Sequence, residues 1–129
     1  MTIQQVISNE KEINELVIAG KAMEAFIKYY GQNVIMSESD GTTRTGKVAC
    51  QAGEEAFFAS VTEFRGAKLL SSVVLESDNP EYEFLVVATW HNDFTTTQYT
   101  FTGNQTSLAY WKDGMIQKVT FKTPAEIIA

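Results

Sequence analysis

The single histidine and a nearby acid are the residues best suited by type and spacing to acid–base chemistry. His91 and Asp93 lie two positions apart in a segment of alternating polarity, so on a strand they share one face. A carboxylate beside an imidazole orients the ring and raises its pKa, as general acid–base catalysis requires. The alternative is a structural pair that faces solvent or another subunit.

A second pair of acids, Glu38 and Asp40, lies in the polar segment 37–46, which is dense in turn-forming residues. With His91 and Asp93 they make up the four predicted catalytic residues. Their alternative role is that of solvated turn residues.

Aromatic side chains are plentiful enough to line a pocket for an apolar molecule. Five are predicted to contact such a ligand: Tyr30, Phe57, Trp90, Tyr99 and Trp111. A tyrosine hydroxyl can donate a hydrogen bond to a ligand carbonyl. The alternative is that the same rings fill the core.

Metal and cofactor chemistry is not expected. One histidine and one cysteine cannot build a usual zinc site, and Cys50 is predicted to be a buried, inert thiol. The sequence has no glycine-rich nucleotide-binding pattern. We therefore expect neither a metal nor a cofactor.

The helices and strands that must position these residues are predicted from the spacing of apolar residues, which changes near Gly66. Apolar residues before it recur at helical spacing and predict one long helix over 10–30, with Asn9 as N-cap and Gly31 at its end. Segment 2–7 is ambiguous and could extend this helix. A short strand is expected over 33–36. Segment 47–64 is again helical, and Gly53 favours two short helices there.

After Gly66 apolar residues recur at every second position. This alternation predicts strands over 67–76, 82–94 and 115–122, and Pro124 closes the last of them. Segments 95–102 and 106–112 form either a hairpin or one long strand with a bulge, and the bulge is favoured. Asp113 and Gly114 predict a hairpin turn. The face of 82–94 that carries Trp90 is the more apolar one, so Trp90 should lie inside and His91 outside.

Length and composition limit the number of domains, the possible partners and the location of the protein. The 129 residues predict a single domain over 1–129, of the α+β class. A net charge of −6 argues against nucleic acid and membrane surfaces as partners. With no secretory signal and no apolar run of ~20 residues, a cytoplasmic location is expected. Apolar residues on both faces of the C-terminal strands predict a homodimer.

Two segments carry a resemblance to a known family. YYGQNVIMSESDGTTRTGKVA (29–49) and WKDGMIQKVTF (111–121) are similar to the nuclear-transport-factor-2-like superfamily, particularly its SnoaL-like branch. The resemblance implies a cone-shaped, mixed or antiparallel sheet wrapped around a long N-terminal helix, a cystatin-like α+β barrel. It also implies a pocket at the wide end and dimerisation through the outer sheet face.

The resemblance does not carry over a particular activity. Dehydratases of this superfamily use a His–Asp pairing in their pocket, and the resemblance does not align His91 and Asp93 with it. Its ketosteroid isomerases use two carboxyl groups, and the matching positions here hold Ser37 and Ser107.

The predicted function is binding of a small apolar ligand in the pocket, with cofactor-free acid–base chemistry of isomerase, cyclase or dehydratase type. The alternative is a non-enzymatic binding or dimerisation module whose pocket is filled by its own side chains. A cavity of ~300 Å³ or more that holds a titratable group would favour the first prediction.

Overall fold

The computed structural model describes residues 1–123 and confirms the α+β class. Its elements are α1 (Ile3–Ile18), α2 (Ala22–Tyr29), β1 (Tyr30–Ser37), β2 (Thr43–Thr45), α3 (Lys47–Ser60), β3 (Val61–Glu76), β4 (Phe84–Thr96), β5 (Thr100–Lys112) and β6 (Met115–Lys122). Pro124, predicted to close the last strand, lies outside the described residues.

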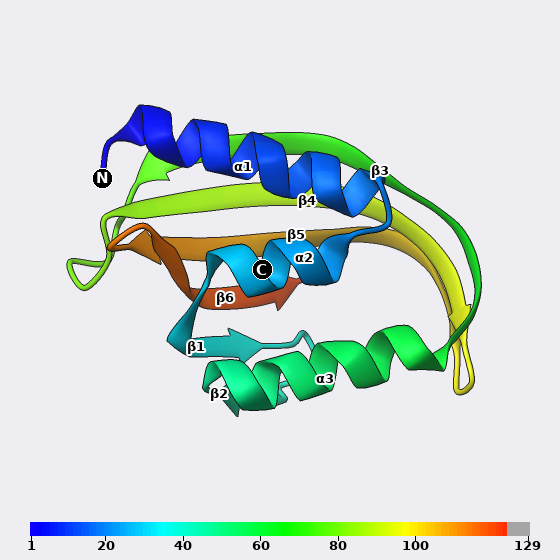
Figure 1. Ribbon diagram of the computed structural model, residues 1–129. Coiled ribbons are helices and arrows are strands. Elements are labelled where there is room, and N and C mark those ends of the chain that lie inside the picture. The colour runs from blue at the N-terminus through cyan, green and yellow to red at the C-terminus, as the bar shows by residue number, and fades with distance from the viewer. Residues whose placement is uncertain (124–129) are drawn as a thin grey trace.

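The sheet is mixed and strongly curved. Its strand order is β2-β1-β6-β5-β4-β3. Neighbouring strands are antiparallel except β1 and β6, which are parallel. Figure 1 shows α1 and α2 lying across the sheet, and the far ends of β3, β4 and β5 bending round toward α3. The concave side of the sheet therefore faces the helices.

The N-terminal helix differs from the prediction at both ends and in its middle. It starts at Ile3, because the Thr2 hydroxyl accepts a hydrogen bond from the Gln5 amide and the Gln5 side-chain oxygen accepts one from the Thr2 amide, forming a capping box. Asn9 is therefore inside the helix. Gly20, at φ 78°, separates α1 from α2 in a backbone conformation that favours glycine. The predicted helix end at Gly31 is wrong, since Gly31 lies in β1.

The second helical segment is one helix rather than two. α3 runs unbroken through Gly53 and stops at Ser60, where β3 begins. Gly53 instead provides space, because a Cβ there would lie 2.5 Å from the Arg44 Nε. A residue with a side chain at position 53 would therefore push Arg44 away from α3.

The long hairpin β4–β5 settles the alternatives left open by the sequence. β5 is continuous from Thr100 to Lys112, and its pairing with β4 shows no register shift at Gly103–Asn104. The turn lies at 97–99, so both the hairpin and the bulge predicted around Gly103 are wrong. The turn at Asp113 (φ 54°) and Gly114 (φ 79°) is confirmed.

The core lies between the two N-terminal helices and the concave side of the sheet. Trp111 is 0 % exposed and packs edge-on against Tyr29, with ring centroids 5.8 Å apart. Cys50 is also buried, and its thiol lies against the carbonyl oxygens of Val34 and Arg44. Within residues 1–123, no helix combines the length and the apolar character that crossing a membrane requires.

Candidate functional site

The larger cavity opens between α3, the loop after β1 and the bent end of the β4–β5 hairpin. Its volume is about 490 Å³. One part of its lining is charged and comprises Glu38, Asp40, Arg44 and Glu54, and another part is aromatic and comprises Phe57, Phe94, Tyr99, Phe101 and Phe121. This volume suits a small organic molecule.

Glu54 is the titratable group most altered by this surrounding. Burial raises its pKa from 4.5 to about 7, and the neighbouring charge of Glu38 adds to the shift. Within the described residues, the Glu54 carboxyl has no hydrogen-bond or ion-pair partner. A carboxyl with a pKa near neutrality is populated in both forms at physiological pH, which suits a general acid or base.

Glu38 and Arg44 form the polar side of the same cavity. The Arg44 guanidinium lies 3.8 Å from the Glu38 carboxylate. Burial raises the Glu38 pKa, although Arg44 partly opposes that shift. Arg44 belongs to β2, a strand that the sequence did not predict. Its side chain passes close to the backbone of Gly53 in α3. Asp40 also reaches this cavity, but a hydrogen bond from the Thr42 amide lowers its pKa, as in a turn residue.

The aromatic side of the cavity is a connected group of rings. Phe94 of β4 packs edge-on against Phe57, with ring centroids 5.4 Å apart, and stacks on Phe101 at 5.5 Å. Tyr99, in the turn of the hairpin, lies 6.2 Å from Phe94. Rings from a helix, two strands and a turn therefore form one apolar wall.

The smaller cavity lies beneath α1 and has a volume of about 160 Å³. Glu10 of α1 faces it and is 7 % exposed. Burial raises the pKa of Glu10 to about 7, and the only opposing effect is a hydrogen bond from Asn14. Tyr30 also lines this cavity, and burial raises its pKa, so its hydroxyl is a neutral donor.

The two cavities adjoin. Gln105 of β5 and Phe121 of β6 line both. Tyr30 experiences the charges of both Glu54 and Glu10, which further raise its pKa. Glu10, which is buried, and Glu54, which is half-buried, therefore line adjoining cavities inside the curved sheet.

The structure places the predicted histidine and its partner acid away from this region. Trp90 lines the smaller cavity, as predicted from the face of its strand. His91 is on the opposite face of β4, where its Nδ1 lies 2.8 Å from the Asn104 side-chain oxygen. Asp93 accepts hydrogen bonds from Arg65 at 2.6 Å and Thr102 at 2.9 Å, and the Arg65 contact lowers its pKa.

The predicted ligand-contacting aromatics divide into three groups. Phe57 and Tyr99 line the larger cavity, and Tyr30 and Trp90 line the smaller one. Trp111 lines neither and belongs to the packed core. Functional roles for the cavity-lining residues, including Glu38 and Asp40, stay predictions.

Sequence reasoning missed Glu10 and Glu54, although a signal was present. On α1, Glu10 continues the apolar stripe of Val6, Ile13 and Val17 at helical spacing. On α3, Glu54 lies between Cys50 and Phe57 in the same way. An acid within the buried stripe of a helix faces the interior, and such acids have perturbed pKa values. Within residues 1–123, no group of three or more His, Cys, Asp or Glu is placed to hold a metal ion.

Comparison with known proteins identifies the fold. One similar solved structure is a Mesorhizobium loti protein proposed to be a SnoaL-like polyketide cyclase. It matches at TM-score 0.67 and 19% sequence identity, over 94% of this chain and 98% of that one. A Xanthomonas campestris protein of unknown function with a cystatin-like fold matches at TM-score 0.74 and 14% identity, over 96% and 92%. A nuclear-transport-factor-2-like protein of unknown function from Burkholderia pseudomallei matches at TM-score 0.69 and 14% identity, over 99% of this chain and 96% of that one.

The chain therefore has the nuclear-transport-factor-2-like fold, in the form also found in proteins described as SnoaL-like. The resemblance inferred from the sequence is confirmed at the level of the fold. No protein-family model matches the sequence, and no curated protein matches it.

Proposed function

We propose that this protein binds a small, largely apolar carbonyl compound in the larger cavity and transfers a proton on it with Glu54. The observation that carries the proposal is a cavity of about 490 Å³ with an aromatic wall and the Glu54 carboxyl in its lining. This volume exceeds the ~300 Å³ expected of a ligand pocket, so a filled, non-binding interior is disfavoured.

The chemistry that fits is proton abstraction next to a carbonyl group. The Glu54 carboxylate would remove a proton from the adjacent carbon, leaving an enolate whose oxygen the Arg44 guanidinium can stabilise. Return of that proton to another carbon completes an isomerisation. In a cyclisation the enolate carbon attacks a second carbonyl of the ligand, and the alkoxide that forms takes the proton back from Glu54. Proton transfer leaves the oxidation level of the ligand unchanged.

The proposal draws support from the neighbours of similar fold, one of which is described as a proposed SnoaL-like polyketide cyclase. Cyclisation of a polyketide requires an enolate of the kind that Glu54 would form. The ligand itself is not identified by this similarity.

Hydrogen–deuterium exchange next to the carbonyl tests the proposal without knowledge of the product. One- to three-ring ketones and enones are incubated with the protein in D₂O, and loss of the proton signal is followed by NMR. Glu54→Gln should slow the exchange by ~10²–10⁴-fold. Glu55→Gln is the matched control, since Glu55 is the next residue, is exposed and bonds to Gln51.

The outcomes separate the alternatives. A wild-type rate in Glu54→Gln would show that Glu54 is not the base. Binding of the ketones without any exchange would favour a non-enzymatic binding module. Absence of both binding and exchange would contradict the proposed function.

A homodimer through the convex face of the sheet is the second part of the proposal. Val73 and Leu75 of β3 are 48 % and 45 % exposed, and they pair across the sheet with Val87 and Leu85. A stable interface should bury at least ~1,000 Å² in total. Light scattering at micromolar concentration should give a dimer mass for the wild type and a monomer mass for Val73→Glu. A monomeric wild type would contradict this part.

A further inference from the structure

The smaller cavity contains a buried acid that the proposed reaction does not use. Glu10 is 7 % exposed and faces the cavity from the middle of α1. Its only side-chain partner within residues 1–123 is Asn14, on the next turn of the same helix. A carboxyl group held in an apolar interior is costly unless it is neutral or finds a partner.

The rest of the cavity lining limits what that partner can be. Most of the wall is apolar, including Trp90 and Phe121, and its lining contains no lysine, arginine or histidine. Asn92 and Gln105 are neutral amides, and the Asn92 side chain donates a hydrogen bond of 3.0 Å to the Gln105 side-chain oxygen. An anionic group would therefore meet a carboxyl with no cation nearby, whereas a neutral oxygen could share a hydrogen bond with Glu10.

The size of the cavity sets the size of the group. Its volume of about 160 Å³ is close to the ~150 Å³ of an apolar protein cavity known to take up benzene. One six-membered ring fits this space. Gln105 and Phe121 line both cavities, so a ligand larger than one ring would have to pass these two side chains to reach the larger cavity.

We infer that the smaller cavity is a binding subsite for a neutral six-membered ring that carries a hydroxyl or carbonyl oxygen, with Glu10 as the residue that binds this oxygen. The inference deepens the proposed function, because it describes one end of the ligand whose reacting carbon would lie near Glu54. Its own test needs only the smaller cavity.

Four one-ring probes that differ in a single group separate the possible ligands: phenol (neutral oxygen), toluene (apolar), benzoate (anion) and benzylamine (cation). Binding is measured by NMR titration at pH 7. The protein has two tryptophans, of which Trp90 lines the smaller cavity and Trp111 does not. The indole N–H signal of Trp90 therefore reports occupancy, and that of Trp111 is an internal control.

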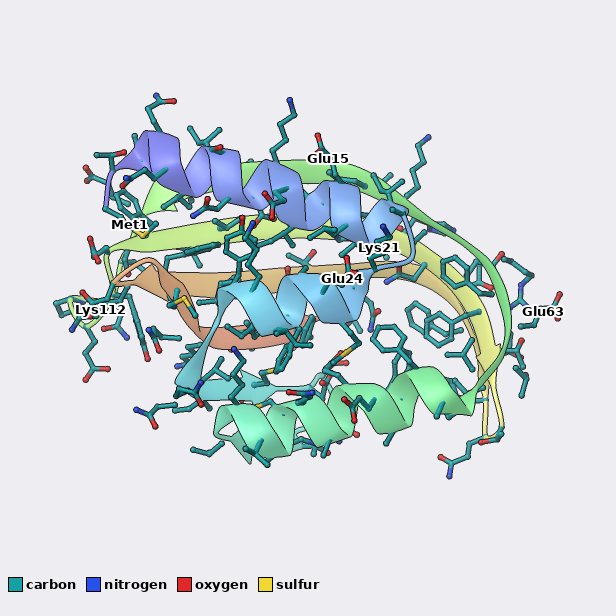
Figure 2. The ribbon with its side chains drawn as sticks, viewed as in Figure 1. Met1, Glu15, Lys21, Glu24, Glu63 and Lys112 are labelled. Atoms are coloured by element: carbon teal, nitrogen blue, oxygen red, sulfur yellow. The ribbon has the colours of Figure 1, made fainter. Side chains whose placement is uncertain are left out.

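The wild type should bind phenol ~10-fold more tightly than toluene, the gain expected from one buried hydrogen bond. Benzoate and benzylamine should bind more weakly than phenol. Glu10→Leu should abolish the preference for phenol while toluene binding is kept, and Glu10→Gln should retain part of the preference. Glu15→Leu is the control, since Glu15 is an exposed residue of the same helix (labelled in Figure 2) and does not line the smaller cavity.

Several outcomes would overturn the inference: equal affinity for toluene and phenol, tighter binding of benzoate or benzylamine, an unchanged preference in Glu10→Leu, or no shift of the Trp90 signal by any probe. These failures are distinguishable from failure of the proposed function. The latter is tested in the larger cavity by Glu54→Gln, a substitution that should leave phenol binding unchanged.

Discussion

Residues next to one another on β4 lie on opposite faces of the sheet and have different surroundings. On the concave face, Trp90, Asn92 and Phe94 line the two cavities together with a buried carboxyl group from α1 and a half-buried one from α3. On the convex face, His91 and Asp93 bond to polar side chains near the surface. The pair of residues that most suggested catalysis, His91 and Asp93, therefore lies on the face that lines neither of these two cavities. Location relative to the interior, rather than residue type, decides which acids have a raised pKa.

Truncation of a concave-face ring should have the largest effect on stability. Trp111 is 0 % exposed, so Trp111→Ala should lower the free energy of unfolding by about 3–5 kcal/mol in urea denaturation. Leu108→Ala, on the convex face of the same strand, should cost less at equal protein concentration. Equal losses would show that the two faces are packed alike.

The pH dependence of stability should report the buried acids of the concave side. Glu10 titrates near pH 7 in the folded protein and near 4.5 when unfolded, so the folded state binds the extra proton between these values. The free energy of unfolding should therefore fall as the pH rises from 4.5 to 7, by up to about 3 kcal/mol.

The measurement is urea denaturation across this pH range, for the wild type and for Glu10→Gln. Glu54 and Glu38 shift in the same direction, so part of the slope should persist in the variant. An identical slope in both proteins would mean that Glu10 is not buried in solution.

A smaller effect should follow from filling the space at Gly53. Alanine favours the helix by about 1 kcal/mol over glycine, but its Cβ would lie 2.5 Å from the Arg44 Nε. Gly53→Ala should therefore keep the protein folded while displacing Arg44 and slowing exchange of the ketone proton. A double-mutant cycle with Arg44→Lys checks this cause, and additive effects would contradict it.

The smallest effect on activity is expected from the convex face. His91→Ala and Asp93→Asn should leave the rate of ketone proton exchange unchanged, because neither residue lines a cavity. Asp93→Asn should weaken the bond to Arg65, which also pairs with Glu63 at 3.3 Å, so the thermal midpoint should fall only slightly. A large loss of exchange in either variant would restore the original catalytic prediction.

Much of the fold could be predicted because it depends on local patterns. The alternation of β4 placed Trp90 inside, and the Asp113–Gly114 turn followed from the conformations those residues adopt. Element ends were less predictable. The capping box at Thr2 and the left-handed conformation of Gly20 gave α1 boundaries different from those suggested by Asn9 and Gly31.

The candidate site was less predictable because its key acids resemble surface residues in the sequence. With a helix start at Asn9, Glu10 is a first-turn acid that faces water. With the start at Ile3 it becomes part of a buried stripe. Arg44 likewise lay in a predicted loop, and only its pairing in β2 beside α3 brings it to the cavity.

The sequence by itself determined the class of fold, the turn at Asp113–Gly114 and the apolar face of β4, since periodicity and turn chemistry act over a few residues. Only the tertiary structure decided where the cavities lie and which acids they enclose. A cavity forms between elements far apart in the chain, here α1, α3 and the curved sheet (Figure 1). The pKa of a carboxyl follows from how much water those elements exclude, which no local pattern specifies.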